Sequence, residues 1–236
     1  MNDRLHLPNV QLRLAGRAVV VICVLALTGC FDVTQKLSIG RNGAGQYQVA
    51  LTANGLLGEA LKNNRGPAVL RHNAVKTHVI AKGDNVTQIA TIDFKSLSDL
   101  RLSDESLSLT NHGRSWFGLG PSHITFRRTL LVDRARRENV PKSAEEDRFG
   151  NELAETMFGD HTYTFSVTVP GSVEHAPAIH IGRSTFNAKL GGGPLNHTVT
   201  WRIPLAALLR AKLLSFEIDF SAYAWMPDAQ SLPAEG

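Results

Sequence analysis

The amino-acid sequence predicts an α+β fold. We expect a single domain with a mainly antiparallel, curved β-sheet and two covering helices, following a signal peptide. Three observations predict it: several segments alternate apolar and polar residues, two shorter segments repeat apolar residues at helical spacing, and an apolar run lies near the N-terminus. The 236 residues, of which 43% are hydrophobic and 19% charged, are typical of a globular protein.

The first 29 residues have the pattern of a bacterial export signal. Arg4, Arg13 and Arg17 precede ten consecutive apolar residues at positions 18–27. Ten helical residues rise about 15 Å, roughly half the thickness of a bilayer core, so this segment is too short to span a membrane. We therefore predict a signal peptide over residues 1–29, which is removed in the mature protein.

The end of this segment, Leu27-Thr28-Gly29-Cys30, resembles the lipobox of bacterial lipoproteins. The resemblance implies transfer of a diacylglyceryl group to the thiol of Cys30, cleavage between Gly29 and Cys30, and acylation of the new amino terminus. Two or three acyl chains hold a protein stably on a membrane. We expect a lipid-anchored protein of the cell envelope whose domain faces the periplasm or the exterior; an uncleaved anchor or a buried first helix is the alternative interpretation.

Charge and cysteine content agree with this prediction. Residues 1–29 contain three of the 25 basic and one of the 21 acidic residues, so the rest of the chain has a formal net charge of +2. A nearly neutral domain gives little reason to expect nucleic acid as a partner. Cys23 and Cys30 are the only cysteines, and neither would be available for a disulfide or a thiolate metal site in the mature domain.

Period-two alternation predicts most of the mature chain to be strands. Hairpins are expected over residues 37–51 and 75–94, and two further strands, near 107–109 and 124–130, flank a glycine-rich loop. The C-terminal third predicts strands at 162–169, 199–203 and 214–221. One apolar and one polar face on each strand favours antiparallel pairing over a single core. We expect the domain to extend over residues 30–222, followed by a polar C-terminal tail at 223–236.

Two segments predict helices. A short helix follows Asn54, which is a favourable N-cap, and turns Leu57, Ala60 and Leu61 inward. A second helix begins with a capping-box pattern at residues 143–146 and ends at Gly159. Its apolar residues recur every fourth position, at Phe149, Leu153 and Met157. Each helix is expected to cover the sheet with one apolar stripe.

Two strand motifs support a family resemblance. Residues 165–173, FSVTVPGSV, end a strand in Pro-Gly, and residues 198–205, TVTWRIPL, carry a Thr-Trp pair. Together with the lipobox, the early hairpin and the helix, they resemble the LppM-type lipoprotein domain over about residues 26–222. The resemblance implies an extracytoplasmic domain at the membrane surface that binds lipids or glycolipids and has no established catalysis. Several relatives also have a C-terminal transmembrane helix, which the polar end of this chain lacks.

Searches for catalytic motifs give no enzyme class. The sequence contains no P-loop, no Gly-x-Ser-x-Gly elbow and no His-Glu-x-x-His helix. The glycine run at 191–193 is not followed by a helix start, which favours a flexible hairpin loop over a phosphate site. His175 and His180 are spaced out of phase for one strand face, so we predict no metal and no cofactor.

Two groups of residues are candidates for contact with a membrane or a lipid. The loop at 116–120 contains Trp116 and Phe117. Three alternatives are open for these side chains: they contact the membrane interface, they close an apolar pocket, or they fill the core. The other group is basic and is a candidate for contact with anionic lipid headgroups. The alternative is that these arginines belong to a solvent-exposed connecting segment, where Asp133 and Glu138 partly neutralise their charge. The members of the basic group are Arg127, Arg128, Arg134, Arg136 and Arg137.

The sequence as a whole predicts a non-enzymatic, membrane-anchored envelope lipoprotein. Its β-rich domain is expected to bind a lipid, a glycolipid or an envelope protein. One alternative is a structural or assembly component of an envelope protein complex. The other is a hydrolase, which would require a hydroxyl, a histidine and a carboxylate within hydrogen-bond reach in one cleft.

Overall fold

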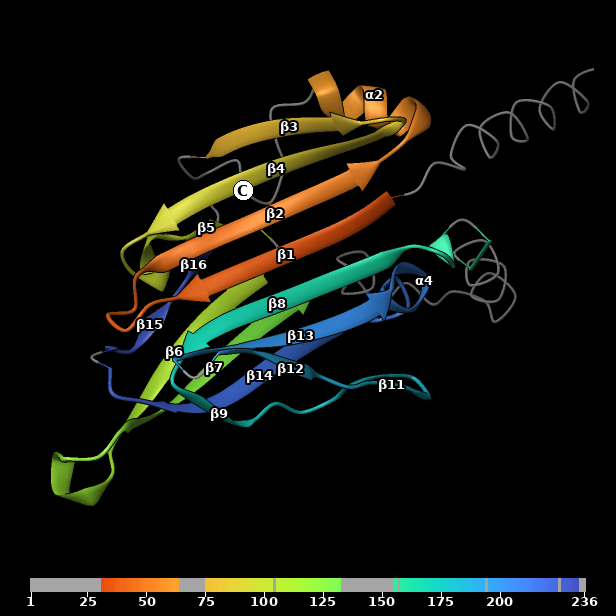
Figure 1. The fold of residues 1–236 in the computed structure, drawn as a ribbon. Helices are drawn as coiled ribbons and strands as arrows, with labels where there is room; N and C mark the ends of the chain where they lie inside the picture. The colour runs from red at the N-terminus through yellow and green to blue at the C-terminus, as the bar shows by residue number, and fades with distance from the viewer. Residues whose placement is uncertain are drawn as a thin grey trace, which may run out of the picture.

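The computed structural model describes residues 31–63, 75–103, 105–132, 155–156, 158–193, 195–224 and 226–233. Over these ranges the chain forms two β-sheets that lie face to face, with two two-stranded sheets and short helices around them (Figure 1). The single sheet that the sequence predicts is therefore two sheets. The apolar face of the larger sheet is covered mainly by the smaller sheet, because strands with one buried face can cover each other as well as helices can.

The larger sheet has seven strands in the order β12-β13-β8-β1-β2-β4-β3. The hairpins predicted at 37–51 and 75–94 are confirmed as β1–β2 and β3–β4, and the strands predicted at 162–169 and 199–203 are confirmed as β8 and β13. The strands of this sheet are β1 (Phe31–Ile39), β2 (Gly45–Ala53), β3 (Lys76–Lys82), β4 (Asn85–Phe94), β8 (Thr162–Pro170), β12 (Lys189–Gly193) and β13 (Asn196–Pro204).

The smaller sheet has five strands in the order β15-β6-β7-β14-β9. They are β6 (Glu105–Arg114), β7 (Ser122–Leu131), β9 (Ser172–His175), β14 (Leu213–Ala222) and β15 (Ala229–Gln230). The remaining elements are β5 (Arg101–Leu102) paired with β16 (Leu232–Pro233), β10 (Ile179–Ile181) paired with β11 (Ser184–Phe186), α2 (Gly55–Asn63), α4 (Leu205–Leu208), and 3-10 turns at Leu97–Asp99 and Trp116–Gly118.

One central pairing departs from the antiparallel arrangement that the sequence predicts throughout. β8 runs parallel to β1, with Val33 beside Tyr163 and Ser38 beside Thr168, and the short strands β5 and β16 are also parallel. Period-two alternation indicates which face of a strand is buried but does not indicate its direction. The chain forms the β6–β7 hairpin of the other sheet before it returns to β1, and so long a connection permits parallel pairing.

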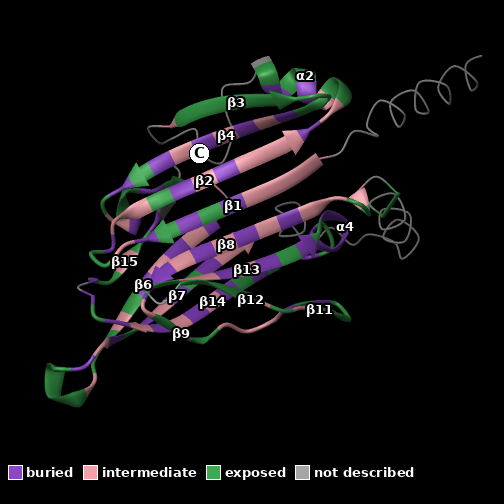
Figure 2. Cartoon of the chain, in the orientation of Figure 1, coloured by how far each residue is buried: buried purple, intermediate pink, exposed green. Residues whose placement is uncertain are grey.

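Alternating side chains fill the space between the sheets, as the buried and intermediate bands along β8, β13 and β14 show (Figure 2). Phe165 on β8 and Trp201 on β13 pack edge-on against Phe216 of β14, with ring centroids 4.9 and 5.3 Å away. Trp201 Nε1 donates to the Pro177 carbonyl over 3.1 Å, which satisfies its one polar group. Burial of each such side chain contributes about 1.5–3 kcal/mol to stability.

The Pro-Gly motif marks the close approach of β8 to β14. Gly171 follows the last residue of β8 and has φ +83°, which L side chains rarely adopt. A Cβ atom on Gly171 would also collide with the backbone carbonyl of Ser221 on β14. Glycine is therefore required here for two reasons, conformation and space.

The two predicted helices have different outcomes. α2 confirms the helix after Asn54, and Leu61 is buried while Leu57 is half-buried. Ala60, which was expected to face inward, is exposed instead. The second helix, predicted over residues 143–159, lies mostly outside the described residues; the few described residues at its C-terminal end are helical.

A fully buried polar cluster joins the two sheets. Arg128 on β7 donates from Nε to Glu105 on β6 over 2.6 Å, and from Nη1 to the Tyr163 hydroxyl on β8 over 2.7 Å. The hydroxyl of Tyr47 on β2 donates to the second oxygen of Glu105 over 2.6 Å. Gln35 Oε1 on β1 accepts from both Arg128 Nη2 and Tyr163. The smaller sheet supplies the ion pair of this Arg128 cluster, and the larger sheet supplies the groups that solvate it.

The position of Arg128 corrects the sequence prediction, which placed it with surface arginines. Its side chain has no exposed area, and its Cζ lies 4.0 Å from the ring centroid of Phe165. Adjacent residues on a strand point to opposite faces, so Arg127 points outward and Arg128 points inward, in phase with Phe126. A buried cation in this place is structural and is not available to a membrane.

Burial changes the acid–base properties of the cluster. It raises the pKa of Tyr163 to about 12 and that of Tyr47 well above its ordinary value. Burial, the largest single effect, lowers the pKa of Arg128, but the charge of Glu105 and the contacts with Tyr163 and Tyr47 together raise it above its ordinary value, so the guanidinium keeps its proton. The neutral phenols and the Arg128–Glu105 ion pair are therefore the stable forms of the cluster at neutral pH.

The residues beyond 222 do not form a separate polar tail, which corrects the predicted boundary. β15 pairs with β6, and β16 pairs with β5. Met226 is 1% exposed, and the Ser231 hydroxyl accepts a hydrogen bond from the Leu107 amide over 2.8 Å. The domain therefore includes residues 226–233.

Replacing Arg128 by Met should lower the free energy of unfolding by about 3–5 kcal/mol, because the Glu105 carboxylate would stay buried without its counter-charge. Urea unfolding followed by tryptophan fluorescence measures this loss. Arg127→Met is the matched control: it removes the exposed ion pair with Glu217 and should cost no more than about 1 kcal/mol. Adding Glu105→Leu to Arg128→Met should restore part of the stability. Equal losses for the two arginine variants would contradict the role of the cluster.

Alkaline pH should destabilise the domain between about pH 10 and about pH 12. The folded-state pKa of Tyr163, about 12, exceeds its unfolded value of 10.0, so the stabilisation is complete below pH 10 and is lost as the pH rises to 12. For Tyr163 alone the loss is about 2–3 kcal/mol, and Tyr47 adds to it with the same sign. Urea unfolding across this range should show a shallower decline for Tyr163→Phe. An identical pH dependence in that variant would rule out this assignment.

Candidate functional site

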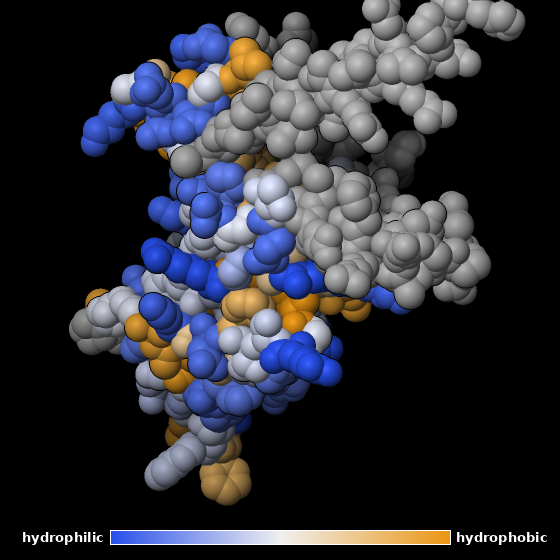
Figure 3. Space-filling model, turned by 90° about the vertical axis from the view of Figure 1, so that its right-hand side faces the viewer, coloured by the Kyte–Doolittle hydropathy of each residue, from blue (hydrophilic) through white to orange (hydrophobic). Residues whose placement is uncertain are grey.

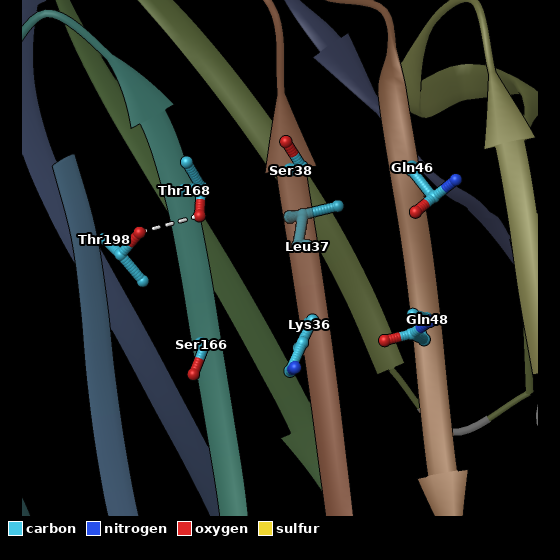
Figure 4. A pocket seen from close by; sticks show the side chains of 8 residues that line it. All are labelled: Lys36, Leu37, Ser38, Gln46, Gln48, Ser166, Thr168 and Thr198. Carbon is cyan, nitrogen blue, oxygen red and sulfur yellow. Dashed lines mark hydrogen bonds between the residues drawn. The ribbon is translucent and has the colours of Figure 1, made fainter. Parts of the chain in front are cut away.

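A polar groove crosses the outer face of the larger sheet (Figure 4). It has a volume of about 330 Å³, and its walls come from the neighbouring strands β13, β8, β1 and β2. We call it the sheet groove. The residues that line it are Lys36, Leu37, Ser38, Gln46, Gln48, Ser166, Thr168 and Thr198.

Strand register arranges the polar side chains of the sheet groove, together with the neighbouring Thr200, in two rows. One row is Gln46, Ser38, Thr168 and Thr198; the next is Gln48, Lys36, Ser166 and Thr200. Neighbours within a row are about 4.8 Å apart, and the rows are about 6.7 Å apart because they are separated by two residues along each strand. The groove is thus a flat array of regularly spaced hydroxyl, amide and ammonium groups.

The array keeps hydrogen-bonding capacity for a ligand. The hydroxyls of Thr168 and Thr198 lie 2.9 Å apart, and those of Ser166 and Thr200 lie 3.0 Å apart. Each hydroxyl has one donor and two acceptor positions, so a paired hydroxyl still has free positions that point outward. Lys36 is exposed between these pairs and the glutamines, and no carboxylate pairs with it in the part of the chain that the structure describes. Such a surface suits a hydroxyl-rich ligand that carries a negative group.

An acidic residue beside the sheet groove is neutralised by its own partners. Asp93 on β4 accepts from Gln46 Nε2 over 2.9 Å and lies 2.7 Å from Lys76 Nζ. The hydrogen bond from Lys76, and then that from Gln46, lowers the pKa of the Asp93 carboxyl, and the same contact raises the pKa of Lys76. Asp93 therefore holds the Gln46 amide in place without presenting an unpaired negative charge to a ligand.

The two predicted basic residues that the structure describes lie on opposite faces of β7. Arg127 is exposed on the outer face of the smaller sheet and pairs with Glu217 over 2.7 Å, whereas Arg128 is buried in the cluster described above. Arg134, Arg136 and Arg137 lie outside the described residues. Of the five arginines, only Arg127 is seen at the surface, and there its charge is paired.

Trp116 and Phe117 lie at the tip of the β6–β7 hairpin. Trp116 is 81% exposed and Phe117 is fully exposed. Two of the three alternatives that the sequence left open are therefore excluded, because neither side chain fills the core or closes a pocket. Contact with the membrane interface is the alternative that remains for this loop.

Cys30 and Gly29 lie outside the described residues, but the residues that directly follow Cys30 are hydrogen-bonded to the start of β8 and the residue before it. β1 begins at Phe31, whose amide donates to His161 Nδ1 over 3.1 Å. The Asp32 carboxylate accepts from the Thr162 amide over 2.8 Å. The chain is thus fixed to the sheet from the first residue after Cys30.

The sequence alone did not predict the sheet groove, although several of its residues are polar positions of predicted strands. Ser166 and Thr168 alternate with buried neighbours, as do Lys36 and Ser38. Their meeting depends on the parallel pairing of β1 with β8, which alternation does not predict. The excess of Ser, Thr and Gln at outward positions was the available signal.

One constellation bears on the hydrolase alternative. On the outer face of the smaller sheet, His112 Nε2 lies 2.9 Å from the Thr125 hydroxyl, and that hydroxyl donates to Asp219 over 2.7 Å. In a catalytic triad the carboxylate orients the histidine, which then accepts the hydroxyl proton. Here the carboxylate accepts the hydrogen bond of the hydroxyl itself and does not orient the histidine, so this arrangement does not activate Thr125 as a nucleophile.

Within the described residues, no group of three or more His, Cys, Asp and Glu side chains is placed to hold a metal ion. A search of the same part of the chain finds no helix with the length and apolar character needed to cross a membrane.

Comparison with known proteins gives no family. No family model matches the chain, and no curated protein is similar to it. Among solved structures, the folded domain of LppM from Mycobacterium tuberculosis is similar over 81% of this chain and 90% of that chain, with 11% identity and a TM-score of 0.45. An M1 zinc metallopeptidase from Deinococcus radiodurans is similar over 80% of this chain and 40% of its own length, with 15% identity and a TM-score of 0.28. Neither similarity assigns an activity.

Proposed function

We propose that this chain is a non-enzymatic lipoprotein of the bacterial cell envelope, held on a membrane by lipid on Cys30, whose domain binds the saccharide headgroup of a glycolipid. The observation that carries the proposal is on β1. This strand begins one residue after the lipobox cysteine and presents Lys36 and Ser38 to the sheet groove.

The anchoring part of the proposal is supported by the order of features at the N-terminus. A basic segment, an apolar run and a lipobox precede β1 directly. Because Phe31 and Asp32 are already hydrogen-bonded to residues 161 and 162, lipid on Cys30 would hold this end of the sheet at the bilayer surface without a spacer. The proposed domain therefore faces the periplasm or the exterior at the membrane surface.

The binding part is supported by where polar and apolar groups lie. Between the sheets, the aromatic rings of Phe165, Trp201 and Phe216 and the Arg128 cluster occupy the space, which favours binding outside the sheet over enclosure of an acyl chain. Hydroxyl, amide and ammonium groups on a flat face match sugar hydroxyls and a phosphate or carboxylate.

The location of the sheet groove also bears on the size of the ligand. Lys36 lies five residues beyond Phe31, which is about 17 Å along an extended strand. When β1 rises from the membrane at its Phe31 end, a ligand in the same membrane must extend about that far to reach Lys36. This distance favours a headgroup of several sugars over a simple phospholipid headgroup.

A second candidate function, a component of an envelope protein assembly, is favoured by one edge of the larger sheet. All seven residues of β3 are exposed, including Val79 and Ile80, and in the described residues β3 pairs only with β4. An open strand edge can accept a strand from a partner. Strand addition at β3 does not depend on Lys36, so the binding experiment below separates the two candidates.

Cys30→Ala should abolish acylation and leave the unprocessed precursor, because the thiol is the only acceptor for the diacylglyceryl group. Metabolic labelling with a radioactive fatty acid, followed by electrophoresis, measures both effects. Cys23→Ala changes the other cysteine of the same segment and should leave labelling and processing intact. A labelled, mature product from Cys30→Ala would refute the anchor.

Lys36→Ala should weaken binding to a negatively charged oligosaccharide by roughly 10- to 100-fold, because it removes a charge-assisted hydrogen bond. Thr168→Val should weaken binding by roughly fivefold through the loss of one neutral hydrogen bond. A glycan array of envelope oligosaccharides, followed by calorimetry on the best ligand, measures these changes. Thr87→Val alters an outward threonine on β4 that does not line the groove, and it should bind as the wild type does. Ligand binding that is equal in all four proteins would exclude the sheet groove.

A further inference from the structure

The loop between β6 and β7 projects beyond the rest of the smaller sheet. The last paired row of this sheet is formed by Arg114, Ser122 and Ala222, and residues 115–121 extend past it. We call these residues the tip loop. It lies at the lower left of Figure 1, at the opposite end of the domain from the start of β1 at Phe31.

The tip loop exposes three large apolar side chains. Trp116, Phe117 and Leu119 are 81%, 108% and 84% exposed, whereas most large apolar residues of the described chain are buried. Residues 116–119 are exposed, as the colour of the tip in Figure 2 shows, and in Figure 3 the same loop is the lowest part of the molecule, with hydrophobic side chains at its end. Such a group of apolar side chains at the surface indicates an interaction site.

Internal hydrogen bonds fix the loop in this conformation. Trp116 and Phe117 have φ values of 53° and 51°, in the left-handed region that costs energy for residues with a Cβ. The Ser115 carbonyl accepts from the Gly118 and Gly120 amides over 3.3 and 2.9 Å, and the Trp116 carbonyl accepts from the Leu119 amide over 3.0 Å. The two aromatic side chains are therefore held outward before any partner is bound.

The same hydrogen bonds make the loop suitable for an apolar medium. Backbone groups that enter a bilayer must be satisfied within the protein, because no water is available there. Four amides of the tip loop are satisfied by carbonyls of the loop itself, the fourth being the Ser115 amide, which donates to Pro121 over 3.2 Å. No residue from 115 to 121 carries a charge. These four are among the six amides of residues 115–120, so desolvation of the tip costs less than that of a loop without internal hydrogen bonds.

The base of the loop has the composition of a membrane interface. Arg114 is exposed directly before the tip loop. Beside the loop lies a hollow of about 320 Å³, bordered by Pro121, by the exposed side chains of Leu195 and Tyr223, and by Arg41. Arginine and tyrosine side chains at the base of an apolar tip are typical of residues that contact the phosphate and headgroup region of a bilayer.

We propose that the tip loop is a second membrane-contact site, which inserts Trp116, Phe117 and Leu119 into a lipid bilayer opposite the one that holds Cys30. A convex, uncharged tip with most of its amides bonded internally fits a fluid apolar layer, whereas a protein partner would need a matching cavity. The start of β1 and the tip loop lie at opposite ends of the domain, and no spacer follows Cys30, so the tip points away from the anchoring membrane. The choice of the opposite bilayer rests on the proposed lipid anchor, whereas insertion of the tip loop into a bilayer does not.

The test uses the processed, lipid-bearing full chain reconstituted in vesicles of phosphatidylcholine and phosphatidylglycerol. Protein-free vesicles of the same composition, with brominated acyl chains, are then added. We expect the vesicles to cluster, measured by light scattering, and the added lipid to quench the Trp116 fluorescence. The double variant Trp116→Ala, Phe117→Ala should reduce clustering at least tenfold. Leu56→Ala and Leu190→Ala, at similarly exposed leucines on α2 and β12, should cluster as the wild type does.

Several outcomes would overturn the proposal. Quenching only by brominated lipid in the host vesicles would mean that the loop contacts its own membrane. Clustering that requires protein in both vesicle populations would indicate contact between two copies. Equal clustering by the double variant, with unchanged thermal unfolding, would exclude the loop. If the wild-type chain is not retained by the host vesicles, the lipid anchor fails instead, and binding of the soluble chain to brominated vesicles still tests the tip loop.

Discussion

The buried ion pair between Arg128 and Glu105 is the constraint on which the arrangement of the two sheets depends. Apolar side chains tolerate small shifts between packed sheets, but a buried charge is stable only when all its polar contacts are made. Those contacts come from Gln35, Tyr47 and Tyr163, on three different strands of the larger sheet. The ion pair therefore fixes how β6 and β7 lie across β1, β2 and β8.

The same three strands build the sheet groove on their opposite face. Gln35 alternates with Lys36 along β1, and Tyr47 lies between Gln46 and Gln48 on β2. Inward residues that hold the Arg128 cluster thus fix the strands whose outward residues line the groove. The outer surface can remain polar and open, because the rigidity of its backbone comes from the core beneath it.

The features proposed to be functional follow one axis of the domain. The end proposed to lie at the membrane begins at Phe31, the sheet groove lies farther along the same strand, and the tip loop lies at the other end. Alternation predicted the main strands and both early hairpins, because each depends on residues close together in the chain. The burial of Arg128 and Glu105 could also have been predicted from the sequence, because Arg128 is in phase with Phe126 and Glu105 is in phase with Leu107. A charge in phase with apolar residues is a signal for a buried pair.

The sequence by itself determined local features of this protein: the hairpins, the helix after Asn54 and the polarity of each strand face, beside the predicted export signal and lipobox. These depend on periodicity, capping and turns, which involve neighbouring residues. Only the tertiary structure decided the parallel pairing of β1 with β8, the division into two sheets, and the exposure of Trp116 and Phe117. These depend on contacts between residues far apart in the chain, and many such pairings are compatible with one pattern of alternating residues.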